Sequence, residues 1–307
     1  MTRSSLTGTT QVWGIIGYPV EHSLSPPMQN AALAQLAING VYVPFPVEPA
    51  TLESAITGLW SLGVQGFNVT LPHKQAVIPY LTSVTDLSQA VGAVNTVWRV
   101  EMGWTGTNTD VTGFIAPLQH SDRDWSQARV VVLGNGGAAR AVVAGCVTLG
   151  CAELWLVGRS ANKLQNFVES WQASPLKRPL HTGLTADLDA LLPSTTLLVN
   201  TTPIGMHPHV EASPVTAQQM ELLPINAIAY DLIYTPSPTQ FLQLASRRGL
   251  QTFDGTEMLV QQGAAALQIW TQQPPPVDLM RQTLRAQLGL GTSQEIKYQL
   301  SRSNQDV

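Results

Sequence analysis

A glycine-rich turn between an apolar run and an alanine-rich segment constrains the fold of this chain most. Residues 130–133 are apolar and mostly β-branched, the turn reads Gly134-Asn135-Gly136-Gly137, and Ala138 begins a helix-favouring segment. Strand, glycine turn and helix in this order form the first βα turn of a dinucleotide-binding unit, where the helix N-terminus meets a pyrophosphate. Ala139 takes the third motif position, where Gly or Ala is usual. The pattern predicts a nucleotide site, although a plain tight turn would look similar.

The size and charge of the chain limit its class. It has 307 residues, enough for two medium domains, with 44% hydrophobic and 12% charged residues. A formal net charge of −4 offers no basic footprint for nucleic acid or an anionic membrane. No apolar run approaches the roughly 18 residues that span a bilayer, and the N-terminal residues lack the apolar stretch of a secretory signal. We therefore expect a cytoplasmic globular protein, a monomer or homodimer, with a small-molecule partner.

The two cysteines are interpreted as structural. Cys146 and Cys151 lie five residues apart around Gly150 in apolar surroundings. A chain of the reducing cytosol is expected to keep them as buried free thiols. A disulfide or redox pair is the alternative.

Apolar runs alternate with helical patterns along most of the chain, which predicts a parallel or mixed α/β sheet. Expected strands cover residues 12–17, 41–47, 64–69, 93–100, 104–107, 130–133, 153–157, 197–200 and 227–231. Expected helices cover 25–40, 51–62, 111–120, 138–149, 160–171, 238–248, 255–271 and 277–288. Prolines place the strand at 41–47 near a sheet edge. Ser25, Asp86 and Asp110 stand where helix N-caps are expected.

The residues that end the next predicted strand, at 153–157, indicate whether the dinucleotide is NAD or NADP. NAD enzymes usually carry Asp or Glu there, to bind the ribose 2′-hydroxyl. Here residues 154–157 lead into Gly158-Arg159-Ser160, without an acid, and Lys163 follows. Arg159 and Lys163 offer two positive charges for a 2′-phosphate. We therefore predict NADP over NAD, with an ordinary loop arginine as the alternative.

Lysine is rare in this chain, which draws attention to Lys74. The other lysines are Lys163, Lys177 and Lys297. Lys74 follows a predicted strand and stands at the start of a short predicted helix. Taken alone, a lysine at a helix start would be interpreted as a solvated side chain.

Several short motifs occur in order and with consistent gaps. They are Ser23-Leu24-Ser25, Asn68-Val69-Thr70-Leu71-Pro72-His73-Lys74, Gly92-Ala93-Val94-Asn95-Thr96, Asn108-Thr109-Asp110, Asn200-Thr201-Thr202-Pro203-Ile204-Gly205-Met206, Asp231-Leu232-Ile233-Tyr234 and Met258-Leu259-Val260-Gln261-Gln262. Each motif is weak alone, and their joint occurrence is specific. From about Gly14 to Trp270 the chain resembles the shikimate dehydrogenase family.

The resemblance implies an NADP-dependent oxidoreductase that interconverts shikimate and 3-dehydroshikimate, as a step of aromatic amino acid biosynthesis through chorismate. It implies Lys74 as general acid/base with Asp110 as partner. It implies substrate binding by Ser23, Ser25, Thr70, Asn95, Tyr234 and Gln262. It implies cofactor binding by Gly134, Asn135, Gly136, Gly137, Ala138, Arg159, Ser160, Lys163, Leu232 and Gly255. Family members often have Asn-Arg-Thr where this chain has Gly158-Arg159-Ser160.

The serine pair agrees chemically with a carboxylate ligand, which the resemblance assigns to it with help from Tyr234. Ser23 and Ser25 are two apart, so an extended segment would point both to one side. Only Arg3 and Arg99 precede Asp110, and neither lies in a motif. Recognition of the carboxylate by hydroxyl groups is therefore expected.

We expect an α/β protein of two domains. Residues 1–110 form a substrate-binding domain, 111–249 a doubly wound Rossmann-type NADP domain, and helices within 250–290 return to the first domain. Residues 291–307 are a polar tail.

Three alternatives stay open. They are a quinate/shikimate dehydrogenase with relaxed substrate or cofactor choice, a non-catalytic NADP-binding regulatory module, and a folate or other dehydrogenase of two-domain architecture. His207-Pro208-His209 is not interpreted as a metal site, because no third ligand stands at a suitable spacing.

Overall fold

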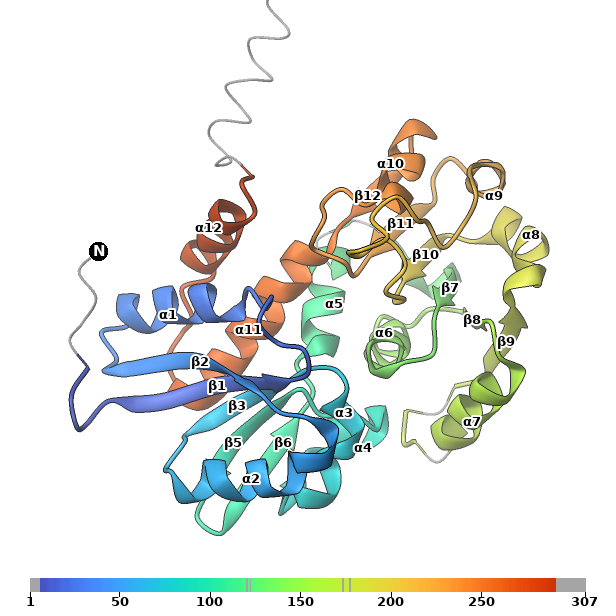
Figure 1. The fold of residues 1–307 in the computed structure, drawn as a ribbon. Helices are drawn as coiled ribbons and strands as arrows, with labels where there is room; N and C mark the ends of the chain where they lie inside the picture. The colour runs from blue at the N-terminus through green and yellow to red at the C-terminus, as the bar shows by residue number, and fades with distance from the viewer. Residues whose placement is uncertain (1–5, 120, 122, 173, 177, 291–307) are drawn as a thin grey trace, which may run out of the picture.

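Two six-stranded sheets, each with helices on both faces, make up the computed structural model (Figure 1). It describes residues 6–119, 121, 123–172, 174–176 and 178–290. The predicted tail at 291–307 lies outside the described residues. No helix in the described ranges is both long and apolar enough to span a bilayer.

The first sheet is mixed and comes from the N-terminal part of the chain. Its strands are β1 (Gln11–Gly17), β2 (Gly40–Pro46), β3 (Gly66–Val69), β4 (Ser83–Val84), β5 (Thr96–Val100) and β6 (Gly103–Thr107). The order is β2-β1-β3-β5-β6-β4, with β5 antiparallel to both β3 and β6. The proline-containing β2 lies at the edge, as predicted.

Helices from both ends of the chain cover this sheet. On one face, α1 (Ser25–Gln35), α11 (Gly255–Thr271) and α12 (Val277–Gln287) bury an apolar cluster with β1, while α2 (Leu52–Ser61) packs on the other face. The C-terminal helices therefore lie against the N-terminal sheet, beside α1 (Figure 1).

The second sheet is entirely parallel. Its strands are β7 (Arg129–Leu133), β8 (Glu153–Gly158), β9 (Leu180–Leu184), β10 (Leu197–Asn200), β11 (Ile228–Asp231) and β12 (Gln251–Phe253). The order β12-β11-β10-β7-β8-β9 is that of a doubly wound Rossmann sheet read from its last strand. The order reverses between β7 and β10, so ligands are expected at the carboxyl ends of these strands.

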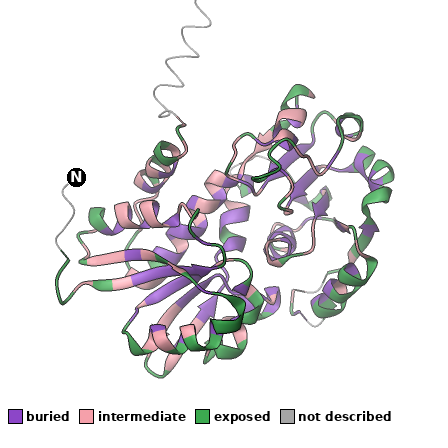
Figure 2. Ribbon diagram, viewed as in Figure 1, coloured by how far each residue is buried: buried purple, intermediate pink, exposed green. Residues whose placement is uncertain are grey.

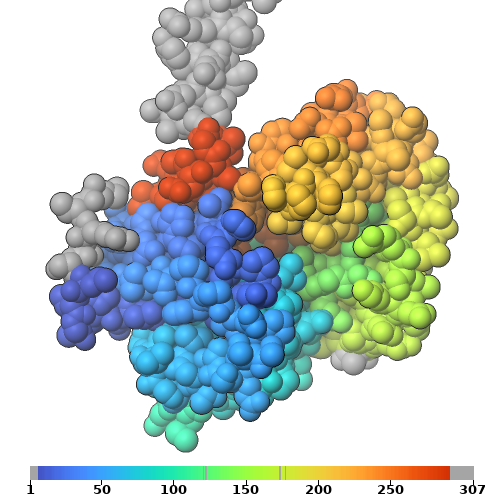
Figure 3. Space-filling view, in the orientation of Figure 1, coloured from blue at the N-terminus to red at the C-terminus, as the bar shows by residue number. Residues whose placement is uncertain are grey.

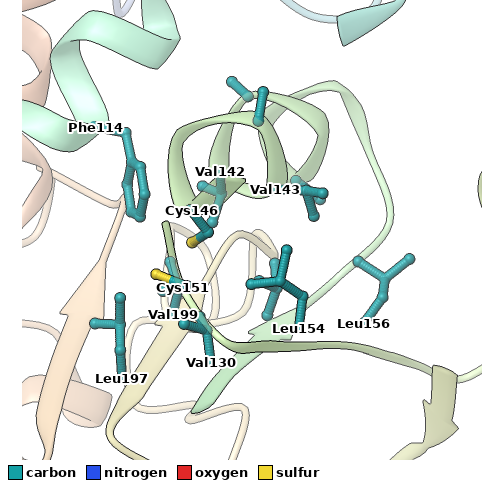
Figure 4. Packing of buried hydrophobic residues seen from close by; sticks show 14 of the residues in the cluster. Phe114, Val130, Val142, Val143, Cys146, Cys151, Leu154, Leu156, Leu197 and Val199 are labelled. Atoms are coloured by element: carbon teal, nitrogen blue, oxygen red, sulfur yellow. The ribbon is translucent and has the colours of Figure 1, made fainter. Parts of the chain in front are cut away.

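The second sheet has an apolar core on each face. One face packs on α5 (Asp110–Gln119), α6 (Gly137–Thr148) and α7 (Ala161–Gln172), the other on α8 (Leu188–Leu191), α9 (Ala217–Glu221) and α10 (Gln240–Arg247). Its central strands β7, β10 and β11 are almost wholly buried, whereas the edge strands β9 and β12 are more exposed (Figure 2). Cys146 and Cys151 lie in the first of these cores as free thiols, with their sulfurs among valine and leucine side chains (Figure 4). The expectation of buried free thiols is confirmed.

Helix α5 joins the two halves. It packs against α11 on one side and α6 on the other. Helices α5 and α11 therefore lie where the two halves meet (Figure 1). The blue-to-cyan half and the green-to-orange half lie side by side in Figure 3.

Several helix boundaries differ from the prediction. Helix α1 ends at Gln35 rather than near Gly40, because Ala37 adopts a left-handed φ of 53°, and Gly40 begins β2. Ser25 is the first residue of α1 and does not cap it, since the N-cap residue is Leu24.

Two predicted acidic caps are also wrong. Asp86 begins α4 (Asp86–Val91), and Thr85 caps this helix by accepting from the Ser88 amide at 3.3 Å. Asp110 begins α5, while the Asn108 side chain accepts from Val111 N at 3.3 Å. In each case a nearby residue supplies the capping oxygen, which leaves the Asp110 carboxylate available for another contact.

Candidate active site

A partly buried ion pair joins Lys74 to Asp110. Lys74 lies in the short helix α3 (His73–Ala76), which follows β3, and Asp110 is the first residue of α5. Lys74 Nζ donates to Asp110 Oδ2 at 2.5 Å, and the two side chains are 15% and 7% exposed. Low exposure limits screening by water, so this attraction exceeds that of surface charges. The geometry holds an ammonium group beside an anionic partner at a fixed position.

The second oxygen of Asp110 is held by Asn95. Asn95 Nδ2 donates to Asp110 Oδ1 at 2.8 Å and lies 3.4 Å from Gln262 Oε1. The backbone N–H of Thr109 donates to Asn95 Oδ1 at 2.7 Å. Because that N–H must meet an oxygen, it fixes which end of the Asn95 amide faces Asp110. Lys74, Asp110, Asn95 and Gln262 therefore form one oriented polar cluster.

The predicted catalytic and substrate residues surround one cavity of about 410 Å³. Ser23, Ser25, Thr70, Lys74, Asn95, Asp110, Tyr234 and Gln262 all line it. They come from α1, α3, α5, α11 and the loops before α1, after β3, before β5 and after β11, so only the folded chain brings them together. Asn68, a polar residue inside a buried strand, also lines the cavity and was not among the predicted site residues.

The serine pair reaches this cavity by a turn and not by an extended segment, contrary to the prediction. Leu24, between the serines, has φ −90° and ψ 1°, and Ser25 already belongs to α1. Ser23 Oγ accepts from the Ser25 backbone N–H at 3.3 Å. Burial raises the pKa of Tyr234, which keeps this phenol neutral as a hydrogen-bond donor. Hydroxyl groups therefore dominate this end of the cavity.

A second cavity, of about 450 Å³, follows the glycine turn at the carboxyl ends of β7 and β10. The predicted residues Gly134, Asn135, Gly136, Gly137, Ala138 and Arg159 all line it. Gly134 has φ +109°, and a Cβ there would come within 2.6 Å of Thr201 Oγ1. Only glycine therefore fits the start of this turn.

A third cavity, of about 360 Å³, continues beyond the second. It is lined by Asn135, Arg159, Ser160 and Lys163, with no acidic residue. Gly158 adds no side chain beside this pocket, and a Cβ there would lie 3.3 Å from Leu164 Cδ2 and 3.8 Å from Asn135 Nδ2. The two cations and two polar side chains form a pocket suited to an anion.

The first and second cavities meet at Lys74. Thr70, Leu71, Lys74 and Ala138 line both of them. The Lys74 side chain lies against the glycine turn, since a Cβ on Gly137 would be 3.6 Å from Lys74 Cβ. A molecule in either cavity therefore comes close to the ammonium group.

The loop after β11 closes the first cavity from the other side. A Cβ on Gly255 would lie 2.1 Å from the Leu232 carbonyl oxygen, so this contact requires glycine. Leu232 and Gly255, predicted as cofactor contacts, line this cavity and not the cavity of the glycine turn.

Asp231 anchors this loop from within the core. Its carboxylate accepts from Thr239 Oγ1 at 2.6 Å, Asn200 Nδ2 at 3.0 Å and Ile233 N at 3.1 Å. Removal from water raises the pKa of the Asp231 carboxyl from 3.8 to about 6, against the lowering effect of these donors. Ionisation of Asp231 therefore costs stability near neutral pH.

We expect Asp231→Asn to flatten the pH dependence of stability. Between pH 3.8 and about 6 the native state binds more protons at this carboxyl than the unfolded state, so its contribution to stability falls as pH rises. The unfolding free energy of the variant, relative to the parent, should rise by on the order of 1 kcal/mol from about pH 5 to about pH 8. Urea titrations at each pH measure it. A pH-independent difference would contradict the raised pKa.

No group of three His, Cys, Asp or Glu side chains suited to a metal ion occurs in the part of the chain that the structure describes. The His207-Pro208-His209 segment therefore gains no third ligand from the described fold.

The fold and the cavities together define a class. A Rossmann sheet with a glycine turn at its switch point, opening onto a polar cavity with a lysine–carboxylate pair, is the arrangement of a nicotinamide-dinucleotide-dependent oxidoreductase. Family models match residues 15–97 as the shikimate dehydrogenase substrate binding domain and residues 255–285 as the shikimate 5′-dehydrogenase C-terminal domain. The chain belongs to the shikimate dehydrogenase family, as its motifs indicated.

Relatives and a solved structure support this membership. The chain is similar to the shikimate dehydrogenases (NADP(+)) of Trichormus variabilis, at 57% identity, and Crocosphaera subtropica, at 54%. Each match covers 93% of this chain and 99% of the relative. The shikimate 5-dehydrogenase of Thermus thermophilus, solved with NADP(H) and shikimate, matches with a TM-score of 0.79 and 32% identity, covering 90% of this chain and 99% of that one.

Proposed function

We propose that this protein catalyses the NADP-dependent interconversion of shikimate and 3-dehydroshikimate. One observation carries the proposal: the Lys74–Asp110 ion pair lies where the polar cavity meets the cavity of the glycine turn. A bound nicotinamide supplies or accepts the hydride there. The proton that completes the reaction must come from, or go to, a group beside the substrate oxygen.

Lys74 is the proposed general acid/base. In the reducing direction its ammonium group donates a proton to the developing alkoxide, and in the oxidising direction the neutral amine accepts one. Asp110 orients the amine and balances its charge through the 2.5 Å contact. Asn95 holds the other Asp110 oxygen, so the carboxylate cannot turn away from Lys74.

The proposed substrate contacts divide the polar cavity into two ends. The hydroxyls of Ser23, Ser25 and Tyr234 would donate to the carboxylate. Thr70, Asn95 and Gln262, nearer the ion pair, would bind ring hydroxyls. The donors and acceptors suit a small polyhydroxy acid better than an apolar ligand.

The proposed cofactor contacts run along the second and third cavities. The turn formed by Gly134, Asn135, Gly136, Gly137 and Ala138 would hold the pyrophosphate at the N-terminus of α6. Arg159, Ser160 and Lys163 would bind the 2′-phosphate, because their cavity has two cations and no acid. Leu232 and Gly255, which line the first cavity, would face the nicotinamide end of the cofactor through backbone. The donor set therefore fits NADP.

The two-domain division is part of this proposal. The substrate domain would be residues 1–110 with the helices of 250–290, and the NADP domain residues 111–249, supported by the separate sheets and by α11 and α12 on the first sheet. Strand β12 extends the second sheet to Phe253. A cytoplasmic location and a monomeric or homodimeric state are predictions, the latter testable by sedimentation.

One assay tests the function and its rivals. The absorbance of reduced nicotinamide is followed with shikimate or quinate, each with NADP or NAD. We expect the highest kcat/KM with shikimate and NADP. Equal rates with quinate would favour the relaxed dehydrogenase, and NADP binding without turnover of either acid would favour the regulatory module. No reaction with shikimate and NADP would overturn the proposal.

A further inference from the structure

A buried tyrosine lies beneath the polar cavity without lining it. Tyr42, on the edge strand β2, is 1% exposed, and its ring packs near Trp270 at a centroid distance of 6.0 Å. Apolar packing alone would be served by phenylalanine. The hydroxyl of Tyr42 therefore needs another explanation.

The Tyr42 hydroxyl begins a chain of hydrogen bonds. It donates to Asn68 Oδ1 at 2.7 Å. Asn68 Nδ2 then donates to the Asn95 carbonyl oxygen and to Thr96 Oγ1, each at 3.0 Å. The Asn95 carbonyl oxygen can only accept, so it fixes Asn68 Nδ2 on that side, and Tyr42 supplies the donor for Asn68 Oδ1 on the other.

Thr96 links Asn68 by hydrogen bonds to Asn95, which holds the ion pair. Its hydroxyl accepts from Asn68, so its own proton points to Asn95 Oδ1 at 3.1 Å or to Thr109 Oγ1 at 2.9 Å. Thr109 Oγ1 in turn donates to Asn95 Oδ1 at 3.1 Å. By either route the donors converge on Asn95 Oδ1, and Asn95 Nδ2 is left to hold Asp110.

Tyr42 also lies near Ser25, at the proposed carboxylate end of the polar cavity. Burial raises the pKa of Tyr42, and the nearby Ser25 side chain acts in the opposite direction. One buried phenol thus lies near a serine at the proposed carboxylate end and begins the hydrogen-bond chain that leads to Lys74.

We propose that Tyr42 is a positioning residue that orients Ser25 and, through Asn68 and Thr96, the Asn95–Asp110–Lys74 cluster. This inference rests on the proposed function of Lys74. Such a chain, in which each donor points the same way, polarises its members. Without the phenol, Asn68 Oδ1 loses its donor, so the Asn68 amide and the Asn95–Asp110 contact beyond it are held less firmly.

The test compares two tyrosine-to-phenylalanine changes. Tyr42→Phe should lower kcat for shikimate oxidation about tenfold and raise the KM for shikimate severalfold, since one buried hydrogen bond typically contributes up to about tenfold. The matched control is Tyr230→Phe, since Tyr230 is also buried and its hydroxyl has no hydrogen-bond partner in the described structure. It should leave both constants within about twofold of the parent.

Changes at Thr96 test the chain separately from Ser25. Thr96→Val keeps the shape but removes the hydroxyl, and it should lower kcat about fivefold with little change in KM. Thr96→Ser restores the hydroxyl and should restore kcat. A role in core packing alone would not give this rescue, nor the different KM effects of Tyr42→Phe and Thr96→Val.

A Lys74→Ala background separates the two proposals. If Tyr42 acts through Lys74, then Tyr42→Phe should lower kcat little further in Lys74→Ala. Unchanged kcat in Tyr42→Phe and Thr96→Val, with Lys74→Ala strongly impaired, would overturn the positioning role alone. Near-normal kcat in Lys74→Ala would instead overturn the proposed function. Melting temperatures of all variants show whether a loss reflects unfolding.

Discussion

Replacing Lys74 by alanine should lower the turnover of shikimate by about 10²-fold or more, with little change in the KM for shikimate. Lys74 is the group that we assign to proton transfer, and it lies where the two cavities meet. Ser23, Ser25 and Tyr234 would still hold the carboxylate, so binding should survive. Steady-state rates with saturating NADP measure the effect.

Lys74→Arg distinguishes proton transfer from charge. An arginine keeps a positive charge beside Asp110 but does not release its proton near neutral pH. It should therefore be impaired about as strongly as Lys74→Ala. Affinity for NADP, measured by titration, serves as the control for correct folding. A Lys74→Ala enzyme with near-normal turnover would exclude Lys74 as the acid/base.

The sequence predicted the parts of the fold that depend on apolar periodicity and glycine turns. The alternation of strands and helices, the edge position of β2 and the βα turn at Gly134 all follow from local chemistry. The strands β4, β9 and β12 were missed because they are two to five residues long and lack an apolar run. Such strands exist because a neighbouring strand offers unpaired backbone groups.

For the site, too, the sequence indicated the residues but not the hydrogen bonds between them. The predicted catalytic, substrate and cofactor residues each line one or more of the three cavities. The paths of hydrogen bonds were not predictable, because they join residues from separate strands. Thus Thr85 rather than Asp86 caps α4, and Tyr42 meets Asn68 across β1. Local patterns indicate candidate residues, and packing decides which partner each one takes.

Replacing Arg159 by alanine should weaken NADP binding about tenfold or more and leave NAD binding within about twofold of the parent. Arg159 lines both the cavity of the glycine turn and the cation-lined cavity beyond it. A hydrogen bond between charged groups contributes about 1.5–3 kcal/mol. Arg159 is exposed, so screening by water places the effect near the lower end of that range. Titrations with NADP and NAD at fixed salt measure the two affinities.

The test of Arg159 depends on comparing the loss of NADP affinity with the loss of NAD affinity. Arg247→Ala removes the same charge from an exposed position on α10, outside the three cavities, and it should change neither affinity. Lys163→Ala should weaken NADP binding less than Arg159→Ala, because an ammonium group lacks the paired donors of a guanidinium. Raising the salt concentration should reduce the affinity for NADP more than that for NAD, since the 2′-phosphate adds charge. Equal losses of NADP and NAD affinity in Arg159→Ala would place Arg159 away from the 2′-phosphate.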